Sequence, residues 1–265
     1  MEHAGFGTGD GSSTSSGDST GQLPFFTRAF APVAERRWHD GPLAALDFET
    51  TGVDPLHDRV VSFALLTDEE AHDGLVDPGV PVPVAASSIH GLDAAALQGA
   101  PSSAVAIAVV ARWVDRLVDR GVPLVVFNAS YDLTMLAAEC RRHGVVEPDW
   151  WRLVVVDPYL VDWGLAPRRR GQRRLVDVAE RLGVRLDAAH EANADARAAL
   201  EVARVQAARN PQIADLTGRQ LMTQQQRWFS AKAENWNRWA IDHGRSLDDP
   251  AGWPLASAVS NLRTA

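Results

Sequence analysis

Cysteine is almost absent from this chain of 265 residues, because Cys140 is the only one. A single cysteine cannot form a disulfide within the chain, and it falls at the spacing of a buried helix face. Long apolar runs are missing as well: no stretch approaches the roughly 20 apolar residues of a membrane-spanning helix. We also find no basic segment followed by an apolar one near the start, the pattern of a secretory signal. The sequence therefore predicts a cytoplasmic protein without a membrane segment.

Positive charge is also scarce. The chain has 26 basic and 34 acidic residues, a formal net charge of -8, and Lys232 is its only lysine. This balance argues against a broad basic groove for nucleic acid. It does not exclude a nuclease, because acidic side chains gather around metal ions, and the bound metals then supply positive charge locally.

Composition and periodicity divide the chain into four parts. Residues 1–22 are rich in Gly, Ser, Thr and Asp, which predicts a disordered tail. Residues 23–40 form an aromatic lead-in segment, and 210–265 form a helical extension. Between them, 41–209 predicts one α/β domain with a five-stranded mixed sheet and helices on both sides. We expect strands near 43–49, 59–66, 72–76, 123–127 and 152–157, and helices near 101–120, 131–142, 175–182 and 191–208.

The stretch from Leu43 to Gly52 joins a short apolar run to two acids. The apolar part, 43–46, predicts a buried strand, and Asp47 and Glu49 stand two residues apart at its end. Side chains at i and i+2 of a strand point to the same side, so the two carboxylates repel each other and lose hydration. A divalent cation relieves both penalties and prefers oxygen ligands. The alternative is a strand end with solvated acids.

Three further residues provide what such a site needs. Asp132 lies in the segment NASYD after another apolar run, and His190 and Asp195 are spaced H-x-x-x-x-D in HEANAD. A metal held by two carboxylates needs more ligands, and a second metal needs more still. Asp132 and His190 also have structural explanations: the helix dipole stabilises an acid in the first turn, and a histidine before a helix is often a cap or a surface residue.

Together these segments resemble the three motifs of the DEDDh exonucleases, a group that includes the proofreading epsilon subunit of bacterial DNA polymerase III. The motifs DFETTG, NASYD and HEANAD occur in the family's order over about residues 40–207, and IHGLD at 89–93 matches a further hallmark. The resemblance implies a ribonuclease H-like fold, with 41–209 as the exonuclease domain, and two Mg²⁺ or Mn²⁺ ions. It implies metal ligands at Asp47, Glu49, Asp132 and Asp195, with His190 completing the catalytic set as general base.

The resemblance also implies where the 3' end of the nucleic acid would bind: backbone groups around Phe48 to Thr51 would contact the terminal nucleotide. His90 is either a substrate contact or a structural histidine in a turn. The arginines at 168–174 form either a solvated loop or a phosphate-binding one. The predicted substrate-binding residues are Phe48, Thr50, Thr51, His90, Asn128, Arg168, Arg169 and Arg170.

These motifs imply a 3'-5' exonuclease that acts on single-stranded DNA and releases nucleoside 5'-monophosphates. Two alternatives stay open. An exoribonuclease would use the same fold and metals, because recognition of the 2'-hydroxyl depends on one local pocket. The second alternative is a non-catalytic module that binds strand ends or a polymerase. The loss of a signature acid would favour such a module, but this sequence retains all of them.

The extension carries Leu221, Trp228, Trp236 and Trp239 near one face of a helix. We expect this helix to pack on the domain through its large aromatic side chains. A second interpretation is a surface for single strands or for a partner, since residues 225–229 (QQRWF) loosely resemble a peptide that binds a sliding clamp. A polymerase or a sliding clamp is therefore a possible partner, and the sequence does not indicate an oligomeric state.

Overall fold

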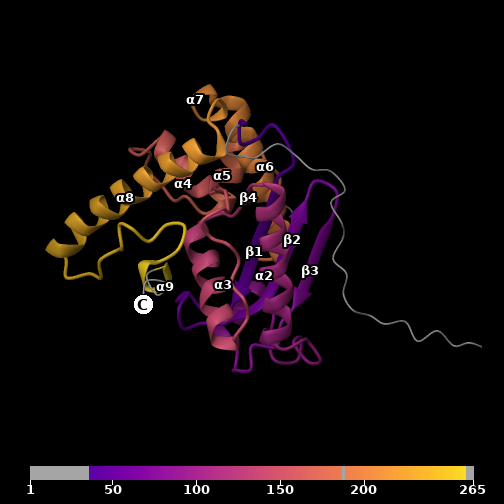
Figure 1. The fold of residues 1–265 in the computed structure, drawn as a ribbon. Helices are drawn as coiled ribbons and strands as arrows, with labels where there is room; N and C mark the ends of the chain where they lie inside the picture. Colours follow the sequence, from indigo (N-terminus) through magenta and orange to yellow (C-terminus); the bar gives the residue numbers. More distant parts are fainter. Residues whose placement is uncertain (1–35, 187–188, 261–265) are drawn as a thin grey trace, which may run out of the picture.

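A mixed sheet of five strands lies at the centre of the computed structural model, which describes residues 36–186 and 189–260 (Figure 1). The strand order is β3-β2-β1-β4-β5. The central strand β1 (Ala44–Thr50) pairs antiparallel with β2 (Val60–Thr67), which pairs antiparallel with β3 (Ala71–Leu75). On its other side β1 runs parallel to β4 (Leu124–Val125), which runs parallel to β5 (Val155–Val156). The predicted α/β fold with a mixed sheet is confirmed. The predicted tail at 1–22 and most of the lead-in segment lie outside the described residues.

Helices cover both faces of the sheet, and the pleat of β1 assigns its side chains to them. Leu46 and Phe48 pack with α2 (Ser103–Arg120) and α3 (Ala129–His143), whereas Ala45 packs with α6 (Ala192–Arg209). Asp47 and Glu49 share the parity of Ala45, so they point to the side of α6. Cys140 is fully buried in the core, as expected. No helix of the described residues is both long and apolar enough to span a bilayer.

Several elements differ from the sequence-based expectation. Helix α1 (Val84–His90) begins after Pro83 and is capped by Gly91 (φ 76°), in a region where we had predicted no helix and had considered His90 as part of a turn. The expected strand at 152–157 contributes only Val155 and Val156 to the sheet, because Asp157 caps α4 (Pro158–Leu165) through the backbone N–H groups of Tyr159 and Leu160. The remaining helices are α5 (Leu175–Leu182), α7 (Pro211–Ala214), α8 (Gly218–Asp242) and α9 (Ser257–Ser260).

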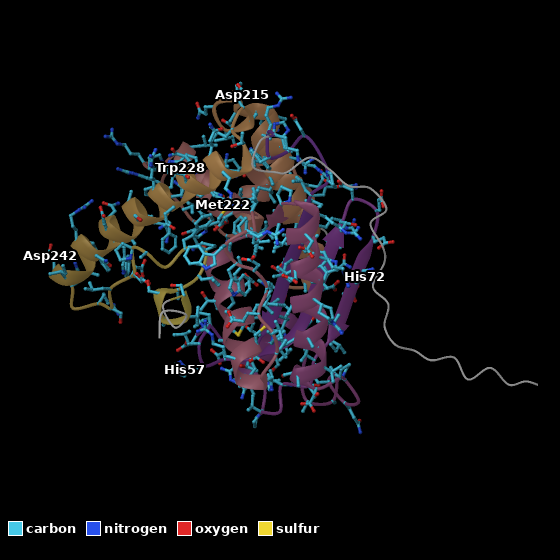
Figure 2. The ribbon with its side chains drawn as sticks, viewed as in Figure 1. His57, His72, Asp215, Met222, Trp228 and Asp242 are labelled. Atoms are coloured by element: carbon cyan, nitrogen blue, oxygen red, sulfur yellow. The ribbon has the colours of Figure 1, made fainter. Side chains whose placement is uncertain are left out.

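The first half of α8 packs on the domain, and its second half extends away from it. Figure 2 shows Met222 and Trp228 on the part of the helix beside the domain and Asp242 at its far end. The ring of Trp228 lies where a Cβ on Gly164 of α4 would be, so only glycine fits there. Trp236 and Trp239 are partly exposed and contact each other, with ring centroids 4.8 Å apart. The expected aromatic packing therefore holds for Trp228 and not for the two later tryptophans.

Side chains of α8 complete the hydrogen bonds of the outer strand β5. The Nε2 of Gln225 donates to the Val155 carbonyl (2.9 Å), and the N–H of Asp157 donates to Gln225 Oε1 (2.7 Å). The N–H of Val155 contacts the sulfur of Met222 at 3.1 Å. Gln225 is fully buried. Two residues of the segment that resembles a clamp-binding peptide, Gln225 and Trp228, are thus used for packing.

Candidate active site

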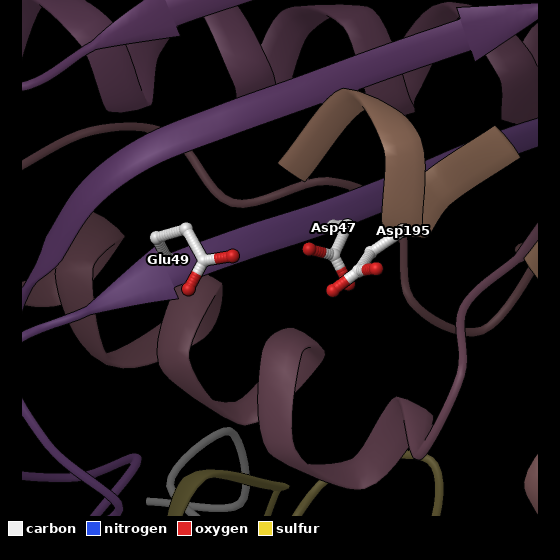
Figure 3. A group of neighbouring side chains, drawn as sticks. All are labelled: Asp47, Glu49 and Asp195. Carbon is white, nitrogen blue, oxygen red and sulfur yellow. The ribbon is translucent and has the colours of Figure 1, made fainter. Parts of the chain in front are cut away.

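Three carboxylates converge at the end of β1 (Figure 3). Asp47 and Glu49 come from β1, and Asp195 comes from the first turn of α6, which packs against that face of the sheet. One oxygen from each carboxylate lies within 4.8 Å of the others. The Oδ1 atom of Asp195 is buried and has no hydrogen-bond partner in the described structure. An acceptor left without a donor beside two other carboxylates is what an oxygen-ligated cation would complete.

Asp132 lies beside this group without belonging to it. It stands in the first turn of α3 and is only 4% exposed. Its carboxylate accepts a hydrogen bond from the backbone N–H of Phe48, and its charge raises the pKa of Asp47. The four predicted metal ligands are therefore neighbours, because the charge of Asp132 affects Asp47, which lies together with Glu49 and Asp195.

Burial and mutual repulsion strongly perturb these acids. Burial, followed by the charges of Asp132, Asp195 and Glu49, raises the pKa of Asp47 well above its ordinary range. Burial and the charge of Asp195 raise the pKa of Glu49 to about 8. Carboxyl groups that resist ionisation in this way gain most from a nearby cation, because its charge favours their ionised form.

The pKa shifts predict that the metal-free protein becomes less stable as the pH rises. A carboxyl whose pKa is raised on folding stabilises the fold only while it is protonated. For Glu49 this contribution is complete below its ordinary value of 4.5 and is lost as the pH passes through about 8. In chelator the melting temperature should therefore fall across this range, and Mn²⁺ should raise it more at the alkaline end. Glu49→Gln should show a shallower fall. A slope unchanged by this substitution would contradict the assignment.

His190 stands immediately before α6 with a backbone that few residues adopt. Its φ is 69°, and its backbone N–H donates to Asp195 Oδ2 at 3.2 Å. A non-glycine residue with positive φ is uncommon, and such conformations cluster at functional sites. Its side chain is exposed and lines both of the cavities that meet at Asp47. The backbone N–H of His190 thus holds the carboxylate of Asp195 in place, while its exposed ring borders both cavities.

Two cavities open on either side of the acids. The first, about 680 Å³, is lined by residues of β1, Glu49 among them, by Asp195 of α6 and by α1. The second, about 910 Å³, contains Asp132 and is lined by residues of α4, α8 and the loop before α5. Both volumes lie in the usual range of ligand sites. The residues shared by the two cavities are Asp47, Phe48, Val53, Asn128, Tyr131 and His190.

The predicted nucleotide-binding turn is held rigid by its own side chains. The hydroxyls of Thr50 and Tyr131 are 2.7 Å apart, and both donate to the Gly52 carbonyl. Thr51 donates to Asp58 Oδ1 (3.1 Å), whose carboxylate occupies the space where a Cβ on Gly52 would lie. Burial raises the pKa of Tyr131 to about 12, so its hydroxyl stays protonated. We had assigned Tyr131 no role from sequence, although it directly precedes Asp132.

His90 and Asn128 line the first cavity, but their hydrogen bonds serve the fold. The ring of His90 bonds to the Thr50 carbonyl (3.2 Å) and accepts from the N–H of Leu92 (3.1 Å), which favours the structural interpretation. Asn128 adopts a left-handed conformation, φ 63°, and its backbone N–H donates to Asp157 at 2.9 Å. Both residues therefore border the cavity while fixing the turns around it.

The three arginines that we predicted to bind substrate, Arg168, Arg169 and Arg170, line neither cavity. Arg168 and Arg170 are exposed, and Arg169 bonds to the buried carboxylate of Asp162 at 2.6 Å. Asp162 also pairs with two further arginines, Arg173 and Arg181. Phosphate contact at positions 168–170 stays a prediction. The basic residues that line the second cavity are Arg173, Arg174 and Lys232.

Residues 44–203 match the RNase T model, a family described as exonucleases. The chain belongs to this exonuclease family. This membership confirms the resemblance to DEDDh enzymes and identifies the protein as a 3'-5' exonuclease, a hydrolase of phosphodiester bonds. The match ends within α6, before α8 begins.

Individual relatives agree with this family. The chain is 28% identical over 167 residues to the DNA polymerase III subunit epsilon of Treponema pallidum, covering 60% of this chain and 73% of that protein. It is 37% identical over 98 residues to a DNA polymerase III subunit epsilon-like protein of Rhodobacter capsulatus, covering 34% of this chain and 13% of that protein. E. coli exonuclease I in complex with a dA16 oligonucleotide has the same fold, with a TM-score of 0.56 and 20% identity over 66% of this chain. The matched part spans 42% of that enzyme, less than half.

Proposed function

We propose that this exonuclease removes nucleoside 5'-monophosphates from the 3' end of single-stranded DNA, using two divalent metal ions. The observation that carries the proposal is the convergence of Asp47, Glu49 and Asp195, with carboxylate oxygens within 4.8 Å, between two cavities. A strand that enters both cavities passes the acids and His190, so its reacting phosphate would lie between them.

The residues present fit Mg²⁺ or Mn²⁺. The donors are carboxylate oxygens, one of which, Asp195 Oδ1, is buried without a hydrogen-bond partner among the described residues, and the raised pKa values of Asp47 and Glu49 support a cation at this place. Asp47, Glu49, Asp132 and Asp195 would hold the ions. When bound, the ions supply positive charge to the phosphate and lower the pKa of bound water.

Residues of the chain would transfer the proton and orient the substrate. His190 would accept the proton of the attacking water on a ring nitrogen, since imidazole changes its charge close to neutral pH. The water oxygen bonds to phosphorus, and the bond from phosphorus to the 3' oxygen of the preceding nucleotide breaks. The products are a nucleoside 5'-monophosphate and a strand with a new 3' hydroxyl. The rigid turn at Thr50 to Gly52 would orient the terminal nucleotide.

Single-stranded DNA is supported by the names of the relatives and by the oligonucleotide bound to E. coli exonuclease I. An exoribonuclease remains the second candidate, because the groups described around the acids do not depend on a 2'-hydroxyl. The epsilon-subunit names also make association with a polymerase a proposal for this chain, although no described surface carries it.

Paired digestion tests the function. Single-stranded DNA and RNA of one sequence, each labelled at the 5' end, are incubated with the protein and Mn²⁺. We expect a ladder shortening from the 3' end of the DNA, with 5'-monophosphates as products and no cleavage in excess chelator. Internal cleavage or full activity in chelator would contradict the two-metal exonuclease. Faster digestion of RNA would identify RNA as the preferred substrate and would leave the proposed mechanism unchanged. Duplex DNA and a strand with a blocked 3' end serve as controls.

A further inference from the structure

We propose that α8 forms one wall of the substrate groove and that Lys232 binds the phosphate on the 5' side of the penultimate nucleotide. The inference rests on the proposed function and extends it to a helix beyond the part of the chain that matches the family, residues 44–203. Lys232 lines the second cavity together with Asp132, Asp47 and His190. The same cavity therefore joins the acids to the only lysine of the chain.

The ammonium of Lys232 is available for an anion. Its Nζ lies 5.4 Å from the centroid of the Tyr159 ring and 5.7 Å from that of Phe229, and it forms no ion pair within the described structure. The other cations of this wall are already partnered: Arg173 with Asp162, and Arg174 with Asp177 at 2.9 Å. A cation held over aromatic faces keeps its charge and its donors for a ligand, and phosphate is the ligand that this chemistry fits.

The packing of α8 fixes where Lys232 points. Gln225, Trp228 and Lys232 follow the i, i+3, i+7 spacing of one helix face. Gln225 is bonded to β5, and Trp228 is fitted against Gly164. The next residue on this face, Lys232, is therefore directed along the domain surface towards the cavity rather than into solvent.

Aromatic side chains that line the second cavity could stack on the base of the penultimate nucleotide. Tyr159 and Trp163 of α4 line the cavity, and the ring of Phe127 meets that of Tyr159 edge-on, with centroids 5.8 Å apart. Single strands bind without sequence preference where bases stack on aromatic rings beside backbone cations. Because the first cavity borders the turn at Thr50 to Gly52, the second is left for the preceding nucleotide.

Two dinucleotides isolate this contact. TpT contains only the phosphate that is cleaved, whereas pTpT adds the phosphate on the 5' side of its first nucleoside, which is the penultimate nucleotide of this substrate. With Mn²⁺, we expect wild-type kcat/KM to be about tenfold higher for pTpT than for TpT, the lower end for a charge-assisted hydrogen bond. In Lys232→Met this ratio should fall to near one, and Lys232→Arg should largely keep it.

The control is Arg238→Met, which removes one charge from an exposed position of the same helix and should keep the wild-type ratio. On labelled oligothymidylate, Lys232→Met should also reduce the slope of log KM against log salt by about 0.7, the effect of one phosphate contact on a single strand. An unchanged ratio in Lys232→Met, or equal losses on TpT and pTpT, would overturn the Lys232 assignment. Failure of the wild type to cleave either dinucleotide or any oligonucleotide would instead contradict the proposed function.

Discussion

Asp47→Asn is expected to abolish metal binding and activity together. The charges of Asp132, Asp195 and Glu49 all raise the pKa of Asp47, and one of its carboxylate oxygens lies within 4.8 Å of those of Glu49 and Asp195, so we expect the ions in this group to depend on it. Losing the positive charge that metals supply in the transition state costs several kcal/mol, which corresponds to about a 10³- to 10⁴-fold lower kcat. Calorimetric titration with Mn²⁺ and single-turnover digestion of labelled DNA measure the two effects.

The same substitution should stabilise the metal-free protein. The pKa of Asp47 is raised by burial and by three neighbouring carboxylates, so its charge opposes folding near neutral pH. In chelator, Asp47→Asn should therefore melt above the wild type, and Mn²⁺ should no longer shift its melting temperature. Asp242→Asn, at the far end of α8, is the matched control and should change neither property. Retained Mn²⁺ binding in Asp47→Asn would show that the metal lies elsewhere.

His190→Asn should give the second largest effect and one that differs in kind. The amide keeps a polar side chain and the backbone N–H that bonds to Asp195, so the acids should hold Mn²⁺ as in the wild type. Loss of a general base lowers kcat by roughly 10²- to 10⁴-fold. Substrate affinity should change little, and the acidic limb of the kcat profile should disappear with the imidazole. The measurements are the pH dependence of single-turnover rates and an Mn²⁺ titration.

A kcat within a few-fold of the wild type would instead make His190 a structural residue that positions Asp195 through its backbone. Its positive φ offers a way to separate the two roles, because glycine adopts that conformation without strain. His190→Gly should therefore keep the hydrogen bond to Asp195 and still lose the proton acceptor. If both variants lose Mn²⁺ affinity, the side chain contributes to the metal site.

The local pattern of the sequence was enough to predict the acidic end of β1. Strand alternation alone places Asp47 and Glu49 on one side, and in the structure their carboxylates lie together beside Asp195 of α6. The motif order then indicated Asp132 and Asp195, although no spacing could show that Asp132 accepts the N–H of Phe48. The mixed sheet followed in the same way from apolar runs separated by turns and helical segments.

The roles of several residues could not be predicted, because they depend on contacts with residues that are distant in the sequence. The arginines at 168–174 form a charge run, but the buried carboxylate of Asp162 engages two of them and Arg181 as well. Lys232 reaches the cavity only because α8 returns across α4, a contact that depends on the missing side chain of Gly164. Tyr131 likewise acquires a role only when Thr50 and Gly52 are brought beside it.

The hydrogen bonds from α8 to β5 predict that the catalytic motifs alone do not make up the smallest unit that folds. A chain cut after Arg209 would retain every signature acid, yet it would leave Val155 and the N–H of Asp157 without Met222 and Gln225. An uncovered outer strand is a template for pairing with other chains, so such a fragment would be prone to aggregate. We therefore expect the folding unit to extend beyond the catalytic motifs, and a chain cut in this way would lose activity through insolubility as well as through the loss of Lys232.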